Sequence, residues 1–74
     1  MTIGEKIKYF RCQIGITQGK LAELTGIHPV SIRKYETNGM VPGIERLSLI
    51  AKALNVSLDV FAPHYLPIDH VCRN

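Results

Sequence analysis

Residues 18–37 place a small residue, a glycine and two large apolar residues at spacings that strongly restrict how the chain can fold. Ala22 stands where a short side chain would let two helices cross closely. Gly26 follows four residues later and suits a tight turn, because glycine adopts a positive φ at no steric cost. Ile32 and Tyr35 lie three residues apart, so on a helix they share one face, which we expect to pack inward. The stretch therefore predicts two short helices joined by a glycine turn.

Capping signals predict a helix before this stretch and mark where the next one begins. Thr2 and Glu5 form a capping box, in which the hydroxyl and the carboxylate each satisfy an amide of the first turn. We expect this first helix to end near Gly15 and the second to begin after Thr17, its N-cap. The apolar stripe of the first helix consists of Ile3, Ile7, Phe10 and Ile14.

The later elements are also predicted to be helical. The third helix opens at Pro29, whose ring presets φ, and ends near Thr37. Asn38 and Gly39 can both take the left-handed conformation that ends helices. A fourth helix follows, and Ser57 caps a short fifth segment. The core residues expected from these two elements are Ile44, Leu47, Ile50, Ala51 and Leu54, with Leu58 and Phe61.

Length and composition restrict the chain to one small all-α domain. Its 74 residues are 46% hydrophobic, and a core of this size is only marginally stable without a partner. We expect no membrane span, because no apolar run is long enough. We also expect no signal peptide, because charged and apolar residues alternate at the start of the chain. Two cysteines, Cys12 and Cys72, are too few for a disulfide scaffold, so we expect reduced thiols and a cytoplasmic location. The five helices should occupy residues 1–62, with residues 63–74 as a C-terminal tail.

The positive charge is concentrated in the first half of the chain. Residues 1–37 contain six basic and three acidic side chains, whereas residues 38–74 contain three of each, so the first half carries the whole net charge of +3. A localised basic surface is typical of proteins that bind a polyanion such as nucleic acid. A net charge of +3 is also common in proteins that bind no polyanion, where it favours solubility.

The segments GITQGKLAELTGI, SIRKYE and LSLIAKALNVSLDVF, with Pro42 between them, resemble the Cro/repressor-type (XRE) helix-turn-helix family over residues 3–62. The chain departs from the family at Gly19, where an acidic residue is usual, at His28, where Ser or Thr is common, and at Asn38, which replaces a glycine. The resemblance implies a compact five-helix, lambda-repressor-like DNA-binding domain with the helix-turn-helix at its second and third helices. The matching positions are Gln18, Ala22, Gly26, Ile32, Tyr35 and Glu36.

The outward face of the third helix is the part that would meet DNA. Because Ile32 and Tyr35 face inward, the helical period turns other side chains outward, beside Pro29 at the N-terminal end. The outward residues are Val30, Arg33, Lys34 and Thr37. The resemblance implies that Pro29, Val30 and Lys34 occupy positions at which the family reads bases.

The chemistry of these side chains indicates what each can recognise. Val30 offers no hydrogen bond but can pack against thymine methyl groups, the alternative being an incidental exposure of one valine. Lys34 can donate to O6 and N7 of guanine, and Arg33 can do the same or bind a phosphate. The alternative for both basic residues is an ordinary solvated face.

Helix N-termini supply the expected phosphate contacts. Thr17 and Gln18 lie at the positive end of the second helix, where free amides and the helix dipole favour an anion, unless they serve in capping alone. Gly43 would expose amides of the fourth helix in the same way, with capping as an equal alternative. His28, at the start of the third helix, is a further DNA-binding candidate.

The resemblance implies that Arg11 and Glu36 pair between the first helix and the end of the third. We favour this structural ion pair over a phosphate contact by Arg11, because a partly buried Glu36 without a partner would be costly.

No pattern predicts an enzyme or a cofactor. His64, His70 and Cys72 match no closed metal site, and nothing supplies an oxyanion hole for a Cys–His nucleophile pair. We therefore expect no catalytic activity, no metal, no cofactor and no small-molecule ligand.

Two functions from different classes remain. The first is a sequence-specific regulator, in the simplest case a repressor, that binds double-stranded DNA as a homodimer on a palindromic operator, since one short helix reads too few base pairs. The second is an antitoxin or other protein-binding module in which the helix-turn-helix is secondary. Light scattering with and without operator DNA would separate them. The candidate dimer residues are Leu49 and, unless the tail folds onto its own domain, Tyr65, Leu66, Ile68 and Val71.

Overall fold

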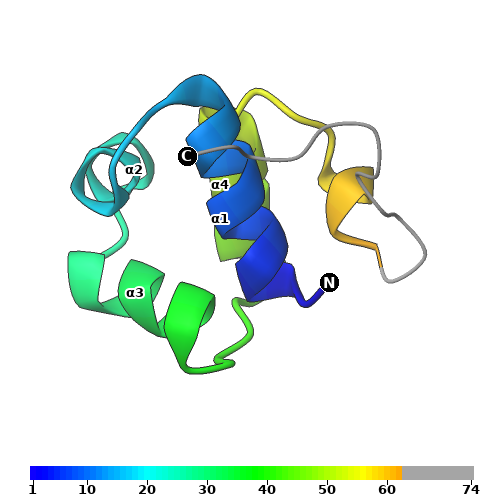
Figure 1. Ribbon diagram of the computed structural model, residues 1–74, viewed down its shortest axis with the longest axis horizontal. Coiled ribbons are helices and arrows are strands. Elements are labelled where there is room, and N and C mark those ends of the chain that lie inside the picture. The colour runs from blue at the N-terminus through cyan, green and yellow to red at the C-terminus, as the bar shows by residue number, and fades with distance from the viewer. Residues whose placement is uncertain (63–74) are drawn as a thin grey trace.

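The computed structural model describes residues 1–62, and in that range the chain is helical without a strand, which confirms the all-α prediction. In Figure 1, α2 and α3 lie to one side of α1 and α4, and the 3-10 helix η1 lies to the other. Helix α3 packs against both α1 and α2, and α2 also packs against α4. The elements are α1 (Ile3–Ile14), α2 (Gln18–Thr25), α3 (Pro29–Thr37), α4 (Ile44–Ala53) and η1 (Leu58–Phe61).

The predicted fifth helix is a single 3-10 turn, so the described residues contain four α-helices and not five. Ser57 caps it as expected, accepting a hydrogen bond from the amide of Asp59. The turn ends at Ala62, which has the extended conformation that a following proline imposes. Since residue 63 is a proline, the segment cannot lengthen into an α-helix.

The predicted helix ends are present, with one correction. The capping box joins the Thr2 amide to Glu5 Oε1 at 2.8 Å and the Glu5 amide to Thr2 Oγ1 at 3.1 Å. Thr17 caps α2 by accepting a hydrogen bond from the Lys20 amide at 3.0 Å. After α3, however, only Gly39 is left-handed, since Asn38 has φ −106°. The glycine alone makes the turn that Asn38 was expected to share.

One core joins all five elements, but three predicted members lie outside it. Ile14 and Ile44 are exposed because they are the last residue of α1 and the first of α4, beyond the reach of the neighbouring helices. Leu58 begins η1 and is also exposed; Val60, two residues later, is buried instead, beside Phe61. The buried cluster contains Ile7, Leu21, Ala22, Ile27, Ile32, Tyr35, Leu47, Ile50, Ala51, Leu54, Val60 and Phe61.

Two features of α1 hold distant parts of the chain in place. Gly4 is buried against α3, where any Cβ would clash with the carbonyl oxygen of Tyr35. Lys6 is buried, and its Nζ donates a hydrogen bond to the carbonyl oxygen of Ala62 at 2.6 Å. Burial also lowers the pKa of Lys6. Helix α1 is thereby positioned against both α3 and the end of η1.

Candidate nucleic-acid interface

The turn between α2 and α3 is fixed by a buried threonine as well as by the glycine. Gly26 ends α2 with φ 75°, and its amide donates to the carbonyl oxygen of Ala22 at 2.8 Å. The Thr25 hydroxyl donates to the carbonyl oxygen of Leu21 at 2.8 Å and accepts a hydrogen bond from the amide of Ile27 at 3.2 Å. The turn therefore has its polar groups satisfied internally, which sets a defined angle between the two helices.

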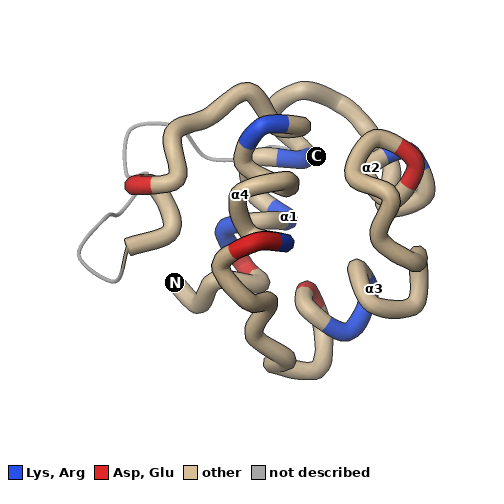
Figure 2. The backbone as a smooth tube through the Cα atoms, turned by 180° about the vertical axis from the view of Figure 1, so that it is seen from behind, with Lys and Arg blue, Asp and Glu red and all other residues tan. Residues whose placement is uncertain are grey.

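Packing fixes which face of α3 is exposed. Ile32 and Tyr35 are 0% and 3% exposed, as predicted, and they anchor the helix to the core. Val30 is exposed over 38% of its surface, and the remaining predicted reading residues lie on the same outer side. Figure 2 shows the basic residues of α3 on the tube, away from those of α1 and α4. Five exposed residues of α3 are ones that we predict to meet DNA, and we call them the reading face: Pro29, Val30, Arg33, Lys34 and Thr37.

His28 caps the start of α3 with an unusual acceptor. Its Nδ1 accepts a hydrogen bond from the amide of Val30 at 3.1 Å. An imidazole nitrogen that accepts a hydrogen bond carries no proton, so the neutral ring has its N–H on Nε2. His28 thus performs the capping role of a Ser or Thr and presents a donor to the surroundings.

Thr37 lies at the other end of the reading face. Its hydroxyl donates to the carbonyl oxygen of Arg33 at 2.7 Å. Because this hydrogen bond occupies the hydroxyl proton, Thr37 is bound to its own helix and retains only acceptor capacity toward a ligand.

A buried carboxylate at the end of α3 links three parts of the chain. Arg11 contacts Glu36 twice, Nε to Oε2 at 2.9 Å and Nη2 to Oε1 at 3.0 Å, so the predicted pair is brought together. The Glu36 side chain is 0% exposed and that of Arg11 is 13% exposed. Nη1 of Arg11 also donates to the carbonyl oxygen of Ile16 at 2.8 Å. The ion pair therefore ties the end of α3 to α1 and to the loop before α2.

Gln18 also belongs to this network, which sequence reasoning did not foresee. Its Nε2 donates to Oε1 of Glu36 at 2.9 Å, so the side-chain nitrogen is already engaged inside the domain. The amides of Gln18 and Gly19 lie in the first turn of α2, where helices leave amides without an intrahelical acceptor. The hydroxyl of Thr17 accepts a hydrogen bond within the cap.

The start of α4 also presents a helix N-terminus. Gly43 is its N-cap, and no side chain caps the first turn there. A Cβ at Gly43 would meet nothing within 4 Å, so the backbone at this point is open to approach. An anion can therefore reach the first-turn amides.

The remaining predicted residues fall into two groups. Leu49 is exposed over 45% of its surface on α4. The tail residues Tyr65, Leu66, Ile68 and Val71 lie outside the described part of the chain, as do His64, His70 and Cys72. Within residues 1–62, no group of His, Cys, Asp and Glu side chains could hold a metal ion. None of the helices in that range is long and apolar enough to cross a membrane.

Comparison with known proteins gives a consistent family. A family model described as helix-turn-helix matches residues 7–61. The chain is 39% identical over 59 residues to the cryptic phage CTXphi transcriptional repressor RstR of Vibrio cholerae, covering 80% of this chain and 53% of that protein. It is 37% identical over 59 residues to an uncharacterized HTH-type transcriptional regulator of Sinorhizobium medicae, covering 80% of this chain and 42% of that protein. The chain thus spans about half or less of the length of these relatives.

Solved structures agree with the sequence comparison. The P22 c2 repressor in complex with the synthetic operator 9T superimposes with a TM-score of 0.76 at 31% identity, covering 82% of this chain and 92% of that one. The solution structure of the DNA-binding domain of the same repressor gives a TM-score of 0.78 at 31% identity, covering 82% of this chain and 80% of that one. The similarity includes the arrangement of the helices.

Proposed function

The chain belongs to the Cro/repressor-type helix-turn-helix family, and from that membership we propose that it is a transcriptional repressor that binds double-stranded DNA with α3 in the major groove. The observation that carries the proposal is the rigid placement of α3. Its inner face is buried in the core, while its outer face offers an apolar N-terminal half and two basic side chains. A helix presented in this way fits the width of the major groove.

Base reading is assigned to the N-terminal half and middle of α3. Val30 and Pro29 form an apolar end that packs against thymine methyl groups. Lys34 lies one turn further along and donates to guanine, and Arg33 contacts either guanine or a phosphate. The Thr37 hydroxyl already donates to the carbonyl oxygen of Arg33, so we assign Thr37 no base contact of its own and expect it only to accept a hydrogen bond from the DNA.

Backbone contacts are assigned to helix N-termini and to the cap of α3. The amides in the first turns of α2 and α4, at Gln18 and beside Gly43, donate hydrogen bonds to DNA phosphates. The Gln18 side chain is held by Glu36, so its backbone amide and its side-chain oxygen remain for contacts outside the domain. His28 adds a donor from Nε2, and the Thr17 hydroxyl caps α2.

Two copies are needed for a specific complex. One α3 reads about four base pairs, which cannot distinguish an operator from a genome of competing sites. A homodimer on a palindromic operator doubles the reading and places the two α3 helices about 34 Å apart, one turn of DNA.

The proposal is tested by selecting bound duplexes from a random pool and measuring their affinity for the full chain and two variants. Lys34→Ala removes a donor from the reading face, and we expect a loss of about 1–3 kcal/mol confined to one symmetric pair of guanines. Lys52→Ala is the matched control, because Lys52 lies in the last turn of α4. It should leave the preferred sequence unchanged.

Two results would count against the assignment. If the pool yields no preferred duplex, the chain is not a sequence-specific DNA-binding protein. If Lys34→Ala weakens selected and random duplexes equally, Lys34 contacts phosphate and not a base.

A further inference from the structure

The turn that ends α3 holds an asparagine followed by a glycine, Asn38 and Gly39. In such a pair the backbone nitrogen of the second residue can attack the side-chain amide of the first, because glycine has no side chain to block the approach. Asn38 is exposed, and Gly39 has φ 73°. A Cβ at Gly39 would meet nothing within 4 Å, so the turn is open to water.

The two nitrogens that would take part are not engaged elsewhere. Within residues 1–62, the amide of Gly39 donates to no acceptor, and Nδ2 of Asn38 makes no hydrogen bond. The Asn38 side chain is held only through Oδ1, which lies 3.2 Å from the Thr37 hydroxyl. Neither the attacking nitrogen nor the departing one has to break a hydrogen bond to another described residue.

The turn has to rotate before these atoms can meet. Asn38 has ψ 7°, which directs the Gly39 nitrogen away from the Asn38 side chain. Rotation about the Cα–C bond of Asn38 leaves its own amide in place, bonded to the carbonyl oxygen of Lys34 at 2.9 Å. The hydrogen bond that this rotation disturbs runs from the Met40 amide to the same oxygen and is long, at 3.4 Å.

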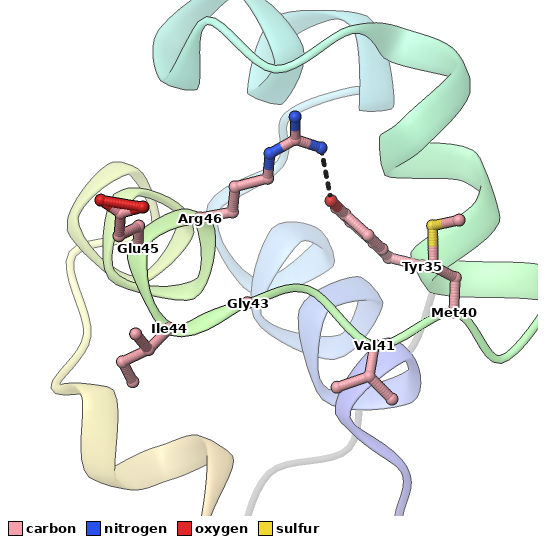
Figure 3. A pocket seen from close by; sticks show the side chains of 7 residues that line it. All are labelled: Tyr35, Met40, Val41, Gly43, Ile44, Glu45 and Arg46. Carbon is pink, nitrogen blue, oxygen red and sulfur yellow. Dashed lines mark hydrogen bonds between the residues drawn. The ribbon is translucent and has the colours of Figure 1, made fainter.

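Helix α3 is anchored independently of this turn. The Tyr35 hydroxyl accepts a hydrogen bond at 2.9 Å from Nη1 of Arg46 on α4 (Figure 3). In Figure 3, Met40 and Val41 lie on the connection that runs from α3 to α4. Both are exposed, and the first buried residue after α3 is Pro42. The turn can therefore rotate while α3 keeps its place.

We propose that Asn38 is a site of spontaneous deamidation whose product weakens base reading by Lys34, an inference that rests on the proposed function. The Gly39 nitrogen forms a bond to Cγ of Asn38, the bond from Cγ to Nδ2 breaks, and Nδ2 leaves as ammonia with the proton that the Gly39 amide gives up. Water then opens the resulting five-membered imide at either carbonyl carbon, which yields aspartate or isoaspartate. The net reaction consumes one water and releases one ammonia.

The new carboxylate forms next to the side chain assigned to guanine. Asn38 is the C-cap of α3 and lies four residues after Lys34, a spacing at which opposite charges on a helix attract each other. Lys34 makes no ion pair with another residue of the range 1–62, so its ammonium group is free to turn toward the carboxylate. The added negative charge also repels the DNA phosphates. Both effects weaken binding to the operator.

The chemical step is tested without DNA, on the full chain kept in warm, mildly alkaline buffer. Proteolytic peptides are weighed at intervals, since deamidation adds about 1 Da. Asn55 is an internal control, because the next residue is the β-branched Val56, whose amide donates to the carbonyl oxygen of Ala51 at 2.9 Å. We expect the Asn38 peptide to convert at least about tenfold faster than the Asn55 peptide, into both aspartate and isoaspartate forms. Equal rates, or no conversion at Asn38, would overturn the proposal.

The effect on DNA binding is measured with the deamidated fraction, separated by ion exchange, and with Asn38→Asp. We expect both to bind a selected duplex about fivefold or more weakly, with a smaller loss at high salt. The preference for the guanine contacted by Lys34 should relax as well, which general repulsion alone would not cause. Asn38→Gln is the matched neutral control, because its longer side chain cannot close a five-membered ring. It should keep its mass and its affinity over the same period.

The outcomes separate this proposal from the proposed function. If no preferred duplex is selected, the proposed function fails, while conversion at Asn38 is still measured by mass. If the fully converted chain binds the selected duplex as the fresh chain does, the link to base reading is refuted. A loss of helical circular dichroism in both the converted chain and Asn38→Asp would also refute it, because unfolding and not Lys34 would then explain the weaker binding.

Discussion

Replacing Arg11 by methionine is predicted to cost the domain a large part of its stability. The substitution keeps an unbranched side chain but removes both hydrogen bonds to Glu36, whose side chain is 0% exposed. A carboxylate left buried without its cation typically costs about 3–5 kcal/mol. Because Gln18 still donates to Oε1 and Arg11 itself is 13% exposed, we place the cost near the lower limit, at about 3 kcal/mol.

The reciprocal substitution Glu36→Gln should cost less, about 1–2 kcal/mol. Arg11 then keeps its hydrogen bond to the Ile16 carbonyl and its partial exposure to water, so its charge is not left buried alone. Urea denaturation of the full chain followed by circular dichroism measures both costs. For Arg11→Met we also expect a melting temperature lower by roughly 12–24 °C, since 1 kcal/mol corresponds to about 4–8 °C in a domain of this size. Equal costs for the two variants, or a cost below about 1 kcal/mol for Arg11→Met, would refute the reasoning from burial.

Three further predictions concern stability. Gly4→Ala should destabilise the fold by several kcal/mol, roughly 3 or more, because its Cβ meets the backbone of α3 at Tyr35; thermal denaturation that leaves the midpoint unchanged would contradict this. Thr25→Val should cost about 1–3 kcal/mol by leaving the Ile27 amide without its acceptor, and the loss should be absent in Thr25→Ser, which keeps the hydroxyl. Burial lowers the pKa of Lys6 below 10.5, so the folded protein binds the proton of its ammonium group less tightly than the unfolded chain does. The free energy of unfolding should therefore rise with pH up to about 10.5, and this rise should be absent from a Lys6→Met variant. Parallel stability curves for the two proteins in alkaline solution would show that Lys6 does not titrate differently on folding.

Local signals in the sequence predict the four α-helices and the exposed face of α3 correctly. Hydroxyl caps, the Gly26 turn and the spacing of Ile32 and Tyr35 act within a few residues of one another, so a pattern of neighbours is enough to identify them. The orientation of α3, and with it the exposure of Val30, follows from that spacing alone.

Contacts between distant segments account for what the sequence does not predict. Lys6 looks like a surface residue of an amphipathic helix, but its hydrogen-bond partner lies 56 residues away at Ala62. Gly4 is required by the approach of α3, which no pattern near residue 4 encodes. Gln18 has the right position for a phosphate contact, yet Glu36, 18 residues later, already holds its amide nitrogen.

Exposure at helix ends is the second source of error. Ile14 and Ile44 continue the apolar stripes of α1 and α4, and the helical period alone places both in the core. Whether a stripe is covered at its ends depends on where the neighbouring helices stop.

The central claim is that α3 reads double-stranded DNA in the major groove. It is tested most directly by a double-mutant cycle that changes both partners of one contact, Val30 and a thymine methyl group. Thymines in a selected duplex are replaced one at a time by uracil, which removes only the methyl group in the major groove, and affinity is measured for the parent chain and for Val30→Ser. At one symmetric pair of positions we expect the loss of the methyl group to weaken the parent by about 1 kcal/mol per half-site and to leave Val30→Ser almost unaffected. If every uracil substitution affects the two proteins equally, Val30 does not contact a thymine methyl group and α3 is not placed in the groove as described.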